Sequence, residues 1–501
     1  TRNYKVTLMA KYLSLDMGAE SGRLVSVDIG TEIKTTEIFR FPTPVTSDDL
    51  GRRCWDFQRI MTSIFDGLKV ASSYGPFVSI GVDTWGLDFG LLNQEMKLIG
   101  NPVSHRDHRT DGYLKITADK VGLERLHKET GAQLLEINSI YQLVAMLDKT
   151  PEELDKAQLL LMMPDLVLYE LTGVAGTEYT IASTTGVFDV FSNDWNLKLA
   201  TDLGIPTQIF GKVEPAGSVR GKLRTDISTS TGIGELLCIA SASHDTASAV
   251  VATPFSQPGS AFISSGTWSL LGVELEEFIA NETTLSHRLT NEGGYEGTNR
   301  LLRNVMGLWL IQEVRRDLEA RGIKLTYAEL VELAEKESDP WRTLIYVDAP
   351  IFVHAGEMIA RIQRFSKETN QPIPESPGQL AQTVFASLAL QYGLTSDVLE
   401  ELSGIHMKQI NIVGGGSQNF HLSQLTADVS GREVITGPVE ATAMGNAIVQ
   451  AIANGDLKDL QSSRELVKNS NLNLHTFKPR PESNLKQVRT KYQELTKVEL
   501  R

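Results

Sequence analysis

The order of the first predicted elements constrains the fold of this chain more than any other feature. Three short stretches, 12–16, 23–29 and 35–41, have the apolar or alternating pattern of β-strands, and prolines close the third. Apolar residues then recur at helical spacing over 57–68, and a further strand follows at 78–83. Three strands in a row predict an antiparallel meander, which excludes the strict βαβ alternation of a Rossmann domain.

The order strand, strand, strand, helix, strand is that of the actin-like, ribonuclease H-like ATPase domain. It recurs more weakly later, with predicted strands at 261–264, 268–273 and 410–413. We therefore predict an α/β protein with two actin-like domains that face each other across a catalytic cleft.

The boundary between these domains is expected at 253–259, a stretch that contains two prolines and a glycine. This gives domains of 1–254 and 255–501, each long enough to bury its own core. Residues from about 456 onward are polar and charged, and predict a helical C-terminal appendage to the second domain.

The composition excludes several classes of partner. The formal net charge is −14 and no cluster of Lys and Arg is present, so nucleic acid is not expected. No apolar run approaches the roughly 20 residues that span a bilayer, and no signal-peptide core precedes Asp16. Cys54 and Cys238 are the only cysteines and fit neither a disulfide framework nor a zinc site. We expect a cytoplasmic protein.

The segment from Asp16 to Arg23 is a glycine turn at the end of a strand. Asp16 can hold Mg²⁺ through water. Gly18 is expected to adopt a backbone conformation closed to other residues, and Gly22 to allow close approach of a ligand. The amides between them can donate to phosphate oxygens, and Arg23 can supply a cation. An ordinary hairpin is the alternative.

A second strand end carries Asp83, Trp85, Gly86 and Asp88. Trp85 offers a flat apolar face for the C–H side of a sugar, and the two aspartates can accept hydrogen bonds from hydroxyls. The alternative is a core tryptophan beside a turn. The polar loop 105–111 is either solvated or part of the same site.

His244 and Asp245 stand on a small-residue scaffold about midway along the chain. A hydroxyl that attacks phosphorus must lose its proton, and a positioned carboxylate such as Asp245 accepts it. His244 can bind a sugar hydroxyl or orient the aspartate. The alternative is that Asp245 is the N-cap of a helix over 246–252, and the two interpretations are compatible.

Two further glycine turns follow strands. Residues 264–267 (Ser-Ser-Gly-Thr) suit the β- and γ-phosphates of a nucleotide, and Gly414, Gly415 and Gly416 suit close approach of a ligand such as adenosine. Residues 440–447 begin a predicted Ala-rich helix, and the small side chains on one of its faces allow tight packing. This face is expected to pack either beneath a nucleotide or against another helix.

Together these motifs resemble the FGGY family of carbohydrate kinases, from about residue 12 to about residue 455. Within the family the resemblance is strongest to the members that phosphorylate L-rhamnulose at O1 with MgATP. So many motifs in the same order exclude chance. The motifs that carry the resemblance are Asp16–Arg23, Gly81–Gly90, Asn101–Gly112, Pro164–Leu166, Ala182–Thr185, His244–Val250, Ile263–Leu271, Thr290–Gly294, Gly307–Glu313, Val413–Asn419 and Glu440–Asn446.

The resemblance implies Asp245 as the proton acceptor and Asp16 as a residue near the Mg²⁺. It implies that ATP is bound by Ala19, Glu20, Ser21, Gly22, Arg23, Thr267, Gln312 and Gly415. It implies that the sugar is bound by Trp85, Gly86, His244, Asp245, Thr246 and Asn304. Glu20 departs from the family, which usually has a small hydroxyl residue there, and a carboxylate beside a polyphosphate is unfavourable unless it points away or holds the metal.

Two alternatives stay open. The first alternative is a sugar kinase whose substrate is L-fuculose or another ketose or deoxyketose, because one side chain can decide between such sugars. The second alternative is a non-catalytic, sugar-responsive actin-like protein. The expected partners are thus a ketose and ATP, and the expected assembly is a monomer or homodimer.

Overall fold

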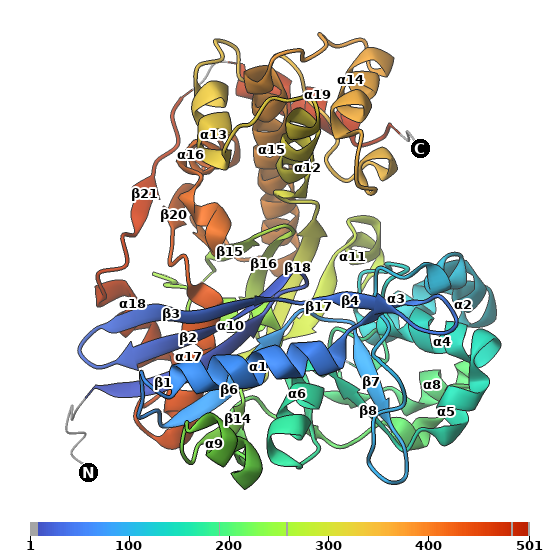
Figure 1. Ribbon diagram of the computed structural model, residues 1–501. Coiled ribbons are helices and arrows are strands. Elements are labelled where there is room, and N and C mark those ends of the chain that lie inside the picture. Colours follow the sequence, from blue (N-terminus) through green and yellow to red (C-terminus); the bar gives the residue numbers. More distant parts are fainter. Residues whose placement is uncertain (1–8, 190, 257–258, 482–483, 499–501) are drawn as a thin grey trace. The chain divides into compact units, whose positions relative to one another are not determined.

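The computed structural model describes residues 9–189, 191–256, 259–481 and 484–498, and the chain divides into two compact units (Figure 1). The first comprises Thr1–Pro254, Glu274–Leu301 and Glu440–Leu472, and the second comprises Phe255–Val273, Leu302–Val439 and Asn473–Arg501. The first break follows Pro254, where the sequence places a domain boundary. Residues 274–301 and 440–472 then return to the first unit.

The sheet of the first unit has the strand order β13-β14-β6-β1-β2-β3. β1 (Ala10–Met17), β2 (Ser21–Ile29) and β3 (Ile33–Pro42) form the predicted antiparallel meander. α1 (Phe57–Ala71) follows, and β6 (Ser79–Thr84) then pairs parallel to β1. β14 (Leu237–Ala240) is parallel to β6, and β13 (Ser218–Lys222) is antiparallel to β14.

Alternation along β1 sends its side chains to the two faces of this sheet. Leu13, Leu15 and Met17 are fully buried in one core with the apolar side of α1. On the other face, Ser14 Oγ donates to the carbonyl oxygen of Ala443, 2.7 Å away, in α17 (Ala441–Asn454). The sheet is therefore covered on both faces, as its two-sided burial pattern requires.

α17 packs closely because small residues line it. A Cβ atom on Gly445 would lie 1.7 Å from the carbonyl oxygen of Ser248 in α10 (Asp245–Val251). A Cβ atom on Gly81 in β6 would likewise lie 2.2 Å from Oδ1 of Asn446. The small face of this predicted helix thus serves helix-to-helix and helix-to-sheet packing.

A second core of the first unit lies in the chain between β6 and β13. β7 (Phe89–Leu92) pairs antiparallel with β8 (Leu159–Met162) beside it. The remaining elements of the first unit are β4 (Val45–Ser47), β5 (Arg53–Trp55), η1 (His108–Thr110), α2 (Tyr113–Val121), α3 (Leu123–Thr130), α4 (Ser139–Lys149), α5 (Pro151–Lys156), α6 (Met163–Thr172), β9 (Thr177–Glu178), α7 (Tyr179–Ala182), β10 (Phe188–Asp189), β11 (Asp194–Trp195), α8 (Leu197–Leu203), η2 (Thr207–Ile209), β12 (Val213–Glu214), α9 (Thr225–Thr231), α11 (Glu282–Ser286), β17 (Thr290–Gly293), η3 (Tyr295–Gly297) and α18 (Leu460–Asn469).

The second unit repeats the pairing pattern of the first. β15 (Ala261–Ser265) is antiparallel to β16 (Ser269–Leu275) and parallel to β19 (Gln409–Val413). β20 (Glu433–Thr436) is parallel to β19 and antiparallel to β21 (His475–Phe477). The same sequence of antiparallel, parallel, parallel and antiparallel pairs confirms two copies of one α/β fold.

Helices complete the second unit (Figure 1). The longest of them, α15 (Pro377–Ser403), begins at a capping box formed by Ser376 and Gln379. It packs against other helices of the same unit. The other elements are β18 (Asn299–Val305), which continues from the first unit, α12 (Trp309–Ala320), α13 (Tyr327–Glu335), η4 (Pro350–Phe352), α14 (Met358–Glu368), η5 (Gly415–Gln418), α16 (Phe420–Ser430) and α19 (Leu485–Leu495).

The predicted appendage does not form one body. α18 belongs to the first unit, whereas β21 and α19 belong to the second. Among the described residues, no helix combines the length and apolar character needed to cross a membrane.

Candidate active site

The carboxyl ends of parallel strands in the first unit bring aspartates together. Asp16 and Asp83 are register partners on β1 and β6. Thr84, at the end of β6, forms a bridge with His244, which directly precedes Asp245. Since parallel strands end at the same edge of a sheet, Asp16, Asp83 and Asp245 gather there, at the edge where α/β proteins usually bind ligands.

Arg23 supplies a positive charge at this edge of the sheet. Its Nη2 lies 2.7 Å from Oδ2 of Asp16, and its Nη1 lies 2.6 Å from Oε2 of Glu440. Burial disfavours the charge of Arg23, but the ion pairs with Asp16 and Glu440 outweigh it and raise the pKa of the guanidinium. Arg23 thus pairs with three carboxylates, since Oε2 of Glu37 lies 3.8 Å from its Nη1, and it fixes Asp16. This differs from the expectation of a cation left for a phosphate.

Asp83 is completely buried. Its Oδ2 accepts a hydrogen bond of 2.6 Å from Nδ2 of Asn446. Burial raises the pKa of Asp83 well above its ordinary value, and the neighbouring carboxylates of Asp16 and Asp245 act in the same direction. The complete burial of Asp83 opposes the hypothesis that it accepts a sugar hydroxyl.

Asp245 is half-buried at the first turn of α10. Its Oδ1 accepts hydrogen bonds from the backbone N of Thr246 at 2.5 Å and from Thr246 Oγ1 at 3.1 Å. Burial raises the pKa of Asp245, His244 opposes this, and Asp16 reinforces it. The helix N-cap is His244 and not Asp245, so the carboxylate lies inside the helix, where it is positioned but still accessible.

His244 connects Asp245 to a buried ion pair. Its Nε2 lies 3.3 Å from Oδ1 of Asp245, and its Nδ1 lies 3.2 Å from Oε2 of Glu292. Nη2 of Arg300 is also 3.2 Å from Nδ1 of His244, and Nη1 of Arg300 is 3.3 Å from Glu292. The tautomer of His244 decides whether Nδ1 donates to Glu292 or accepts from Arg300.

The first glycine turn is compact. The backbone N of Gly18 donates to the carbonyl oxygen of Ser21, and Gly18 has no left-handed φ, contrary to expectation. A Cβ atom on Gly22 would lie 2.4 Å from the ring of Phe41, so packing alone requires this glycine. Ala19 and Ser21 are half-buried, and Glu20 is exposed, with its carbonyl oxygen bonded to the backbone N of Thr43.

Trp85 does not present an open face. It is 7% exposed, its ring centroid lies 4.4 Å from that of Trp55, and its Nε1 donates to Oδ2 of Asp88. The same Oδ2 accepts from Nε1 of Trp55 and contacts Nδ1 of His105. Asp88 therefore organises these rings from the core. Burial raises its pKa, but His105 and the indole donors reverse this and lower the value.

The backbone after Trp85 is held in a rare conformation. Leu87 has a φ of +78°, a region that L-residues seldom occupy. Its carbonyl oxygen accepts a hydrogen bond of 2.5 Å from Ser139 Oγ, and its N donates to Thr184 Oγ1. Gly86 is half-buried against Thr184, whose Oγ1 would lie 3.0 Å from an added Cβ atom. Such local strain is typical of a ligand site.

In the second unit, the glycines after β19 have separate roles. Gly414 has a φ of +81°, which favours glycine. A Cβ atom on Gly416 would lie 2.0 Å from Oγ of Ser265. Gly415 is exposed, has no left-handed φ, and would meet nothing within 4 Å among the described residues. Neither conformation nor packing therefore requires a glycine at 415.

The turn after β15 faces the start of α12. The backbone N of Leu308 donates to the carbonyl oxygen of Gly266, and that of Trp309 donates to Thr267 at 3.0 Å. Gln312 follows in the first turn of α12, and in the described part of the chain its Oε1 is buried without a hydrogen-bond partner. The bond between Trp309 and Thr267 thus ties this turn to the helix that carries Gln312. Asn304 is half-buried in β18, within the second unit.

Comparison with known proteins identifies the family. The model of the N-terminal domain of the FGGY family of carbohydrate kinases matches residues 11–252, and the model of its C-terminal domain matches residues 261–454. The chain belongs to the FGGY family of carbohydrate kinases. It is therefore a sugar kinase, and the resemblance inferred from its motifs is confirmed.

Rhamnulokinases and sugar kinases of known structure resemble the chain over nearly its whole length. It is 39% identical to a rhamnulokinase of Oceanobacillus iheyensis, over 93% of this chain and 97% of the relative. It is 39% identical to a rhamnulokinase of Enterococcus faecalis, over 92% of each chain. Among solved structures, glycerol kinase of Plasmodium falciparum with ADP has a TM-score of 0.79 at 16% identity, covering 98% of this chain and 99% of that one. Gluconate kinase of Lactobacillus acidophilus has a TM-score of 0.78 at 17% identity, covering 97% and 96%.

Several residues of the FGGY site escape sequence reasoning. Glu292 lies in a motif of the resemblance, but its sequence gives no sign of a contact with His244. Glu440 also lies in such a motif, without a sign of its ion pair with Arg23, and Arg300 lies outside these motifs and proves to be completely buried.

An FGGY kinase uses ATP, whose phosphates carry a divalent cation. In the part of the chain described by the structure, no three His, Cys, Asp or Glu side chains are arranged to hold a metal ion. The carboxylate of Asp16 at the end of β1 fits a Mg²⁺ ion that takes its other ligands from waters and phosphate oxygens.

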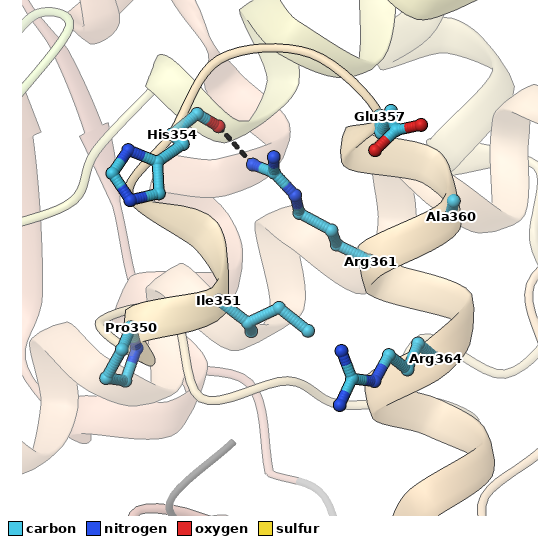
Figure 2. A pocket seen from close by; sticks show the side chains of 7 residues that line it. All are labelled: Pro350, Ile351, His354, Glu357, Ala360, Arg361 and Arg364. Carbon is cyan, nitrogen blue, oxygen red and sulfur yellow. Dashed lines mark hydrogen bonds between the residues drawn. The ribbon is translucent and has the colours of Figure 1, made fainter. Parts of the chain in front are cut away.

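The second unit also has an open pocket of about 560 Å³ beside α14 (Figure 2). Pro350 and Ile351 form its apolar floor, and Arg361 donates to the carbonyl oxygen of His354 across it. Arg364 projects from the next turn of α14 and pairs with Glu368. Both arginines thus have partners within the protein, and the pocket contains none of the residues discussed above.

Proposed function

We propose that the chain transfers the γ-phosphate of MgATP to the O1 hydroxyl of L-rhamnulose, giving L-rhamnulose 1-phosphate. One observation carries the chemistry: Asp245 is accessible at the carboxyl edge of the first sheet, positioned by Thr246 and flanked by His244. The rhamnulokinases that the chain resembles at 38–39% identity support the choice of sugar.

Asp245 is the proposed general base. It accepts the proton of the O1 hydroxyl as that oxygen attacks the γ-phosphorus and ADP departs. Burial raises the pKa of Asp245, which strengthens it as a base compared with an exposed aspartate. His244 stabilises the ionised form before transfer and contributes a hydrogen bond to a neighbouring hydroxyl of the sugar.

The two domains divide the substrates in this proposal. Gly86, His244 and Thr246 in the first unit bind the sugar, with Trp85 supporting them from the core, and Asn304 adds a contact from the second unit. Thr267, Gln312 and Gly415 bind ATP. The open space at Gly415 and the unpaired Oε1 of Gln312 support nucleotide contacts there.

The backbone amides of Ala19–Arg23 are proposed to contact the phosphates. Mg²⁺ offsets the phosphate charge when bound, and Asp16, fixed by Arg23, is the residue proposed nearest to it. The exposed side chain of Glu20 is free to point away from the polyphosphate, which removes the main objection to a carboxylate in this turn.

L-Fuculose or another ketose is the alternative substrate, because a pocket that differs by one methyl group discriminates by only about 1–3 kcal/mol. A non-catalytic actin-like role is the distant alternative, and the presence of Asp245 disfavours it. We place the reaction in the cytoplasm, where MgATP is available. Light scattering after gel filtration tests the expected monomer or homodimer.

A coupled ADP-release assay tests the proposal. The sugars to compare at saturating MgATP are L-rhamnulose, L-fuculose, L-xylulose, L-ribulose, D-xylulose, D-ribulose and glycerol. We expect the highest kcat/KM on L-rhamnulose. A higher value on another ketose would replace the substrate and keep the base, whereas no turnover by folded protein on any of these would contradict the proposed substrate class.

A further inference from the structure

A chain of buried hydrogen bonds reaches the catalytic segment from behind, through residues with no role in the proposed reaction. Its last member is Thr180, at the start of α7 and completely buried. Thr180 Oγ1 accepts a hydrogen bond of 3.1 Å from the backbone N of His244. Because His244 caps α10, this bond fixes the backbone from which Asp245 projects.

Glu178 is the centre of this chain and is also completely buried. Its carboxylate accepts from the backbone N of Thr180 at 2.9 Å, from Thr180 Oγ1 at 2.7 Å and from the backbone N of Ile181 at 3.1 Å. It also accepts from the backbone N of Ser243 at 3.2 Å. Glu178 thus holds Ser243 directly and His244 through Thr180, two consecutive residues that precede the base.

A buried ion pair supports Glu178. Asp165 accepts a hydrogen bond of 3.1 Å from the backbone N of Glu178 and one of 2.9 Å from Nη2 of Arg220. Arg220 is 2% exposed, and its Nε lies 2.9 Å from Oε2 of Glu214. A Cβ atom on Gly176 would lie 2.6 Å from the guanidinium carbon, so the chain leaves room for this arginine.

Such a network is costly for stability alone. Isolated buried carboxylates lose much of their hydration, and apolar residues of the same shape often replace buried ionic groups without loss. Three donors to Glu178 belong to α7 and cap that helix, whereas the backbone N atoms of Ser243 and His244 donate from the two residues before Asp245. Capping of α7 does not explain these last two bonds. Hydrogen-bonded residues behind a reactive group commonly fix its orientation.

We propose that Glu178 and Thr180 are positioning residues for the general base: they fix the backbone of Ser243 and His244 so that Asp245 and His244 hold one arrangement. This inference rests on the proposed role of Asp245. It deepens that proposal by assigning a function to α7, which touches neither substrate in our assignment.

The test compares Thr180→Val, which removes the hydroxyl at nearly constant volume, with Thr180→Ser, which restores it. Thr117→Val is the matched control, because Thr117 is equally buried and donates only to Tyr113 within α2. We expect kcat on the best ketose to fall about 10- to 100-fold in Thr180→Val, the size of a small misplacement of a catalytic group. We expect an unchanged KM for ATP, and recovery of most of kcat in Thr180→Ser.

Hydrogen–deuterium exchange provides a readout that does not depend on turnover. The peptide that covers 241–250 should exchange faster in Thr180→Val than in wild type or Thr117→Val, since the amide of His244 loses its acceptor. If this peptide is unchanged, or if kcat of Thr180→Val stays within about twofold of Thr180→Ser, the positioning role is wrong. Faster exchange in a protein that phosphorylates no sugar would keep the backbone contact and overturn the proposed function instead.

If Thr180→Val does not fold, Glu178→Gln serves in its place. The carboxamide has the same shape but must direct an NH₂ group at one of four donors, so it weakens the same contacts. We expect the same loss of kcat, the same KM for ATP and the same local rise in exchange. Wild-type kcat in Glu178→Gln would overturn the proposal.

Discussion

Nε2 of His244 lies 3.3 Å from Oδ1 of Asp245, and the two residues are neighbours in the sequence. Adjacent side chains in a helix project in different directions, so the two side chains can approach each other only because the helix begins between them. Because His244 is the N-cap, with an extended ψ of 124°, its imidazole turns back toward the carboxylate of the first helical residue. A start of α10 one residue earlier or later would separate the pair.

Asp245→Asn tests the base directly. The amide keeps the shape of the side chain but cannot accept the proton, so we expect kcat to fall by about 10²- to 10⁴-fold. Calorimetric binding of ATP and of the best ketose should change little. Asp119→Asn, at an exposed residue of α2, is the control and should keep wild-type kcat. Near-normal kcat in Asp245→Asn would remove this residue from the base role.

The pH profile should show the raised pKa of Asp245. Only the ionised carboxylate accepts a proton, so activity is lost as the pH falls through the pKa of this group. Burial raises that pKa above 3.8, and Asp16 adds to the shift while His244 opposes it. We therefore expect the acidic limb of kcat/KM for the sugar to lie above pH 3.8 at saturating MgATP. A limb at or below 3.8 contradicts the assignment.

Arg300 and Glu292 should be strongly coupled in stability. Both are buried, and their charged atoms lie 3.3 Å apart. Arg300→Met removes the guanidinium from Glu292 and leaves His244 as the contact of its carboxylate. Breaking comparable buried pairs costs about 3–5 kcal/mol. Urea unfolding of Arg300→Met, Glu292→Gln and the double variant measures this. The double variant should be more stable than Arg300→Met, and simple additivity of the two losses would show that the pair is not coupled.

Substitutions at two neighbouring glycines of the second unit should distinguish an effect on ATP binding from an effect on stability. Gly415→Ala adds a methyl group where nothing lies within 4 Å, so Tm should stay the same while KM for ATP rises if the nucleotide lies there. Gly416→Ala places its methyl group against Ser265 and should lower Tm. A Gly415→Ala variant with wild-type KM for ATP would place the nucleotide elsewhere.

Glu20→Ser restores the small hydroxyl residue that the family usually has. Because the side chain of Glu20 is exposed, its repulsion of a polyphosphate is screened by water and salt. We expect KM for ATP to fall by about 1.5- to fivefold, the range of single exposed charge interactions. Glu32→Ser, in the turn between β2 and β3, is the control. Unchanged KM and unchanged Mg²⁺ dependence would show that Glu20 has no role in the phosphate turn.

The fold could be predicted in large part because period-two and helical patterns are local. The strands at 12–16, 23–29, 35–41 and 78–83 and the helix over 57–68 all exist, and the recurrence at 261–264 and 410–413 marks the second copy. Contacts between segments far apart in the sequence could not be predicted from these local patterns. Nothing near residue 441 indicates that this late helix covers β1 and β6 of the first sheet.

The candidate site could be predicted at the level of motifs but less well at the level of side chains. Asp16 and Asp245 do lie at one edge of the sheet, because strand ends dictate this. Burial changed the interpretation of Trp85 and Asp83, since aromatic and acidic residues look alike in sequence whether they face a ligand or a core. The contacts of Glu292, Arg300 and Thr180 with His244 depend on tertiary packing alone.

One face of the sheet in the first unit is covered by α17, a helix that is synthesised late. Asn446 bonds to Asp83, and Gly445 packs against Ser248, so the edge that carries Asp245 is incomplete until α17 arrives. Ribosomes add about 5 to 20 residues per second, so a nascent first unit waits on the order of tens of seconds after residue 254 before α17 is available. During that interval the polar face around Ser14 and Gly81 is uncovered. Chaperone dependence during translation should therefore concentrate on the first unit, even though its sequence begins the chain.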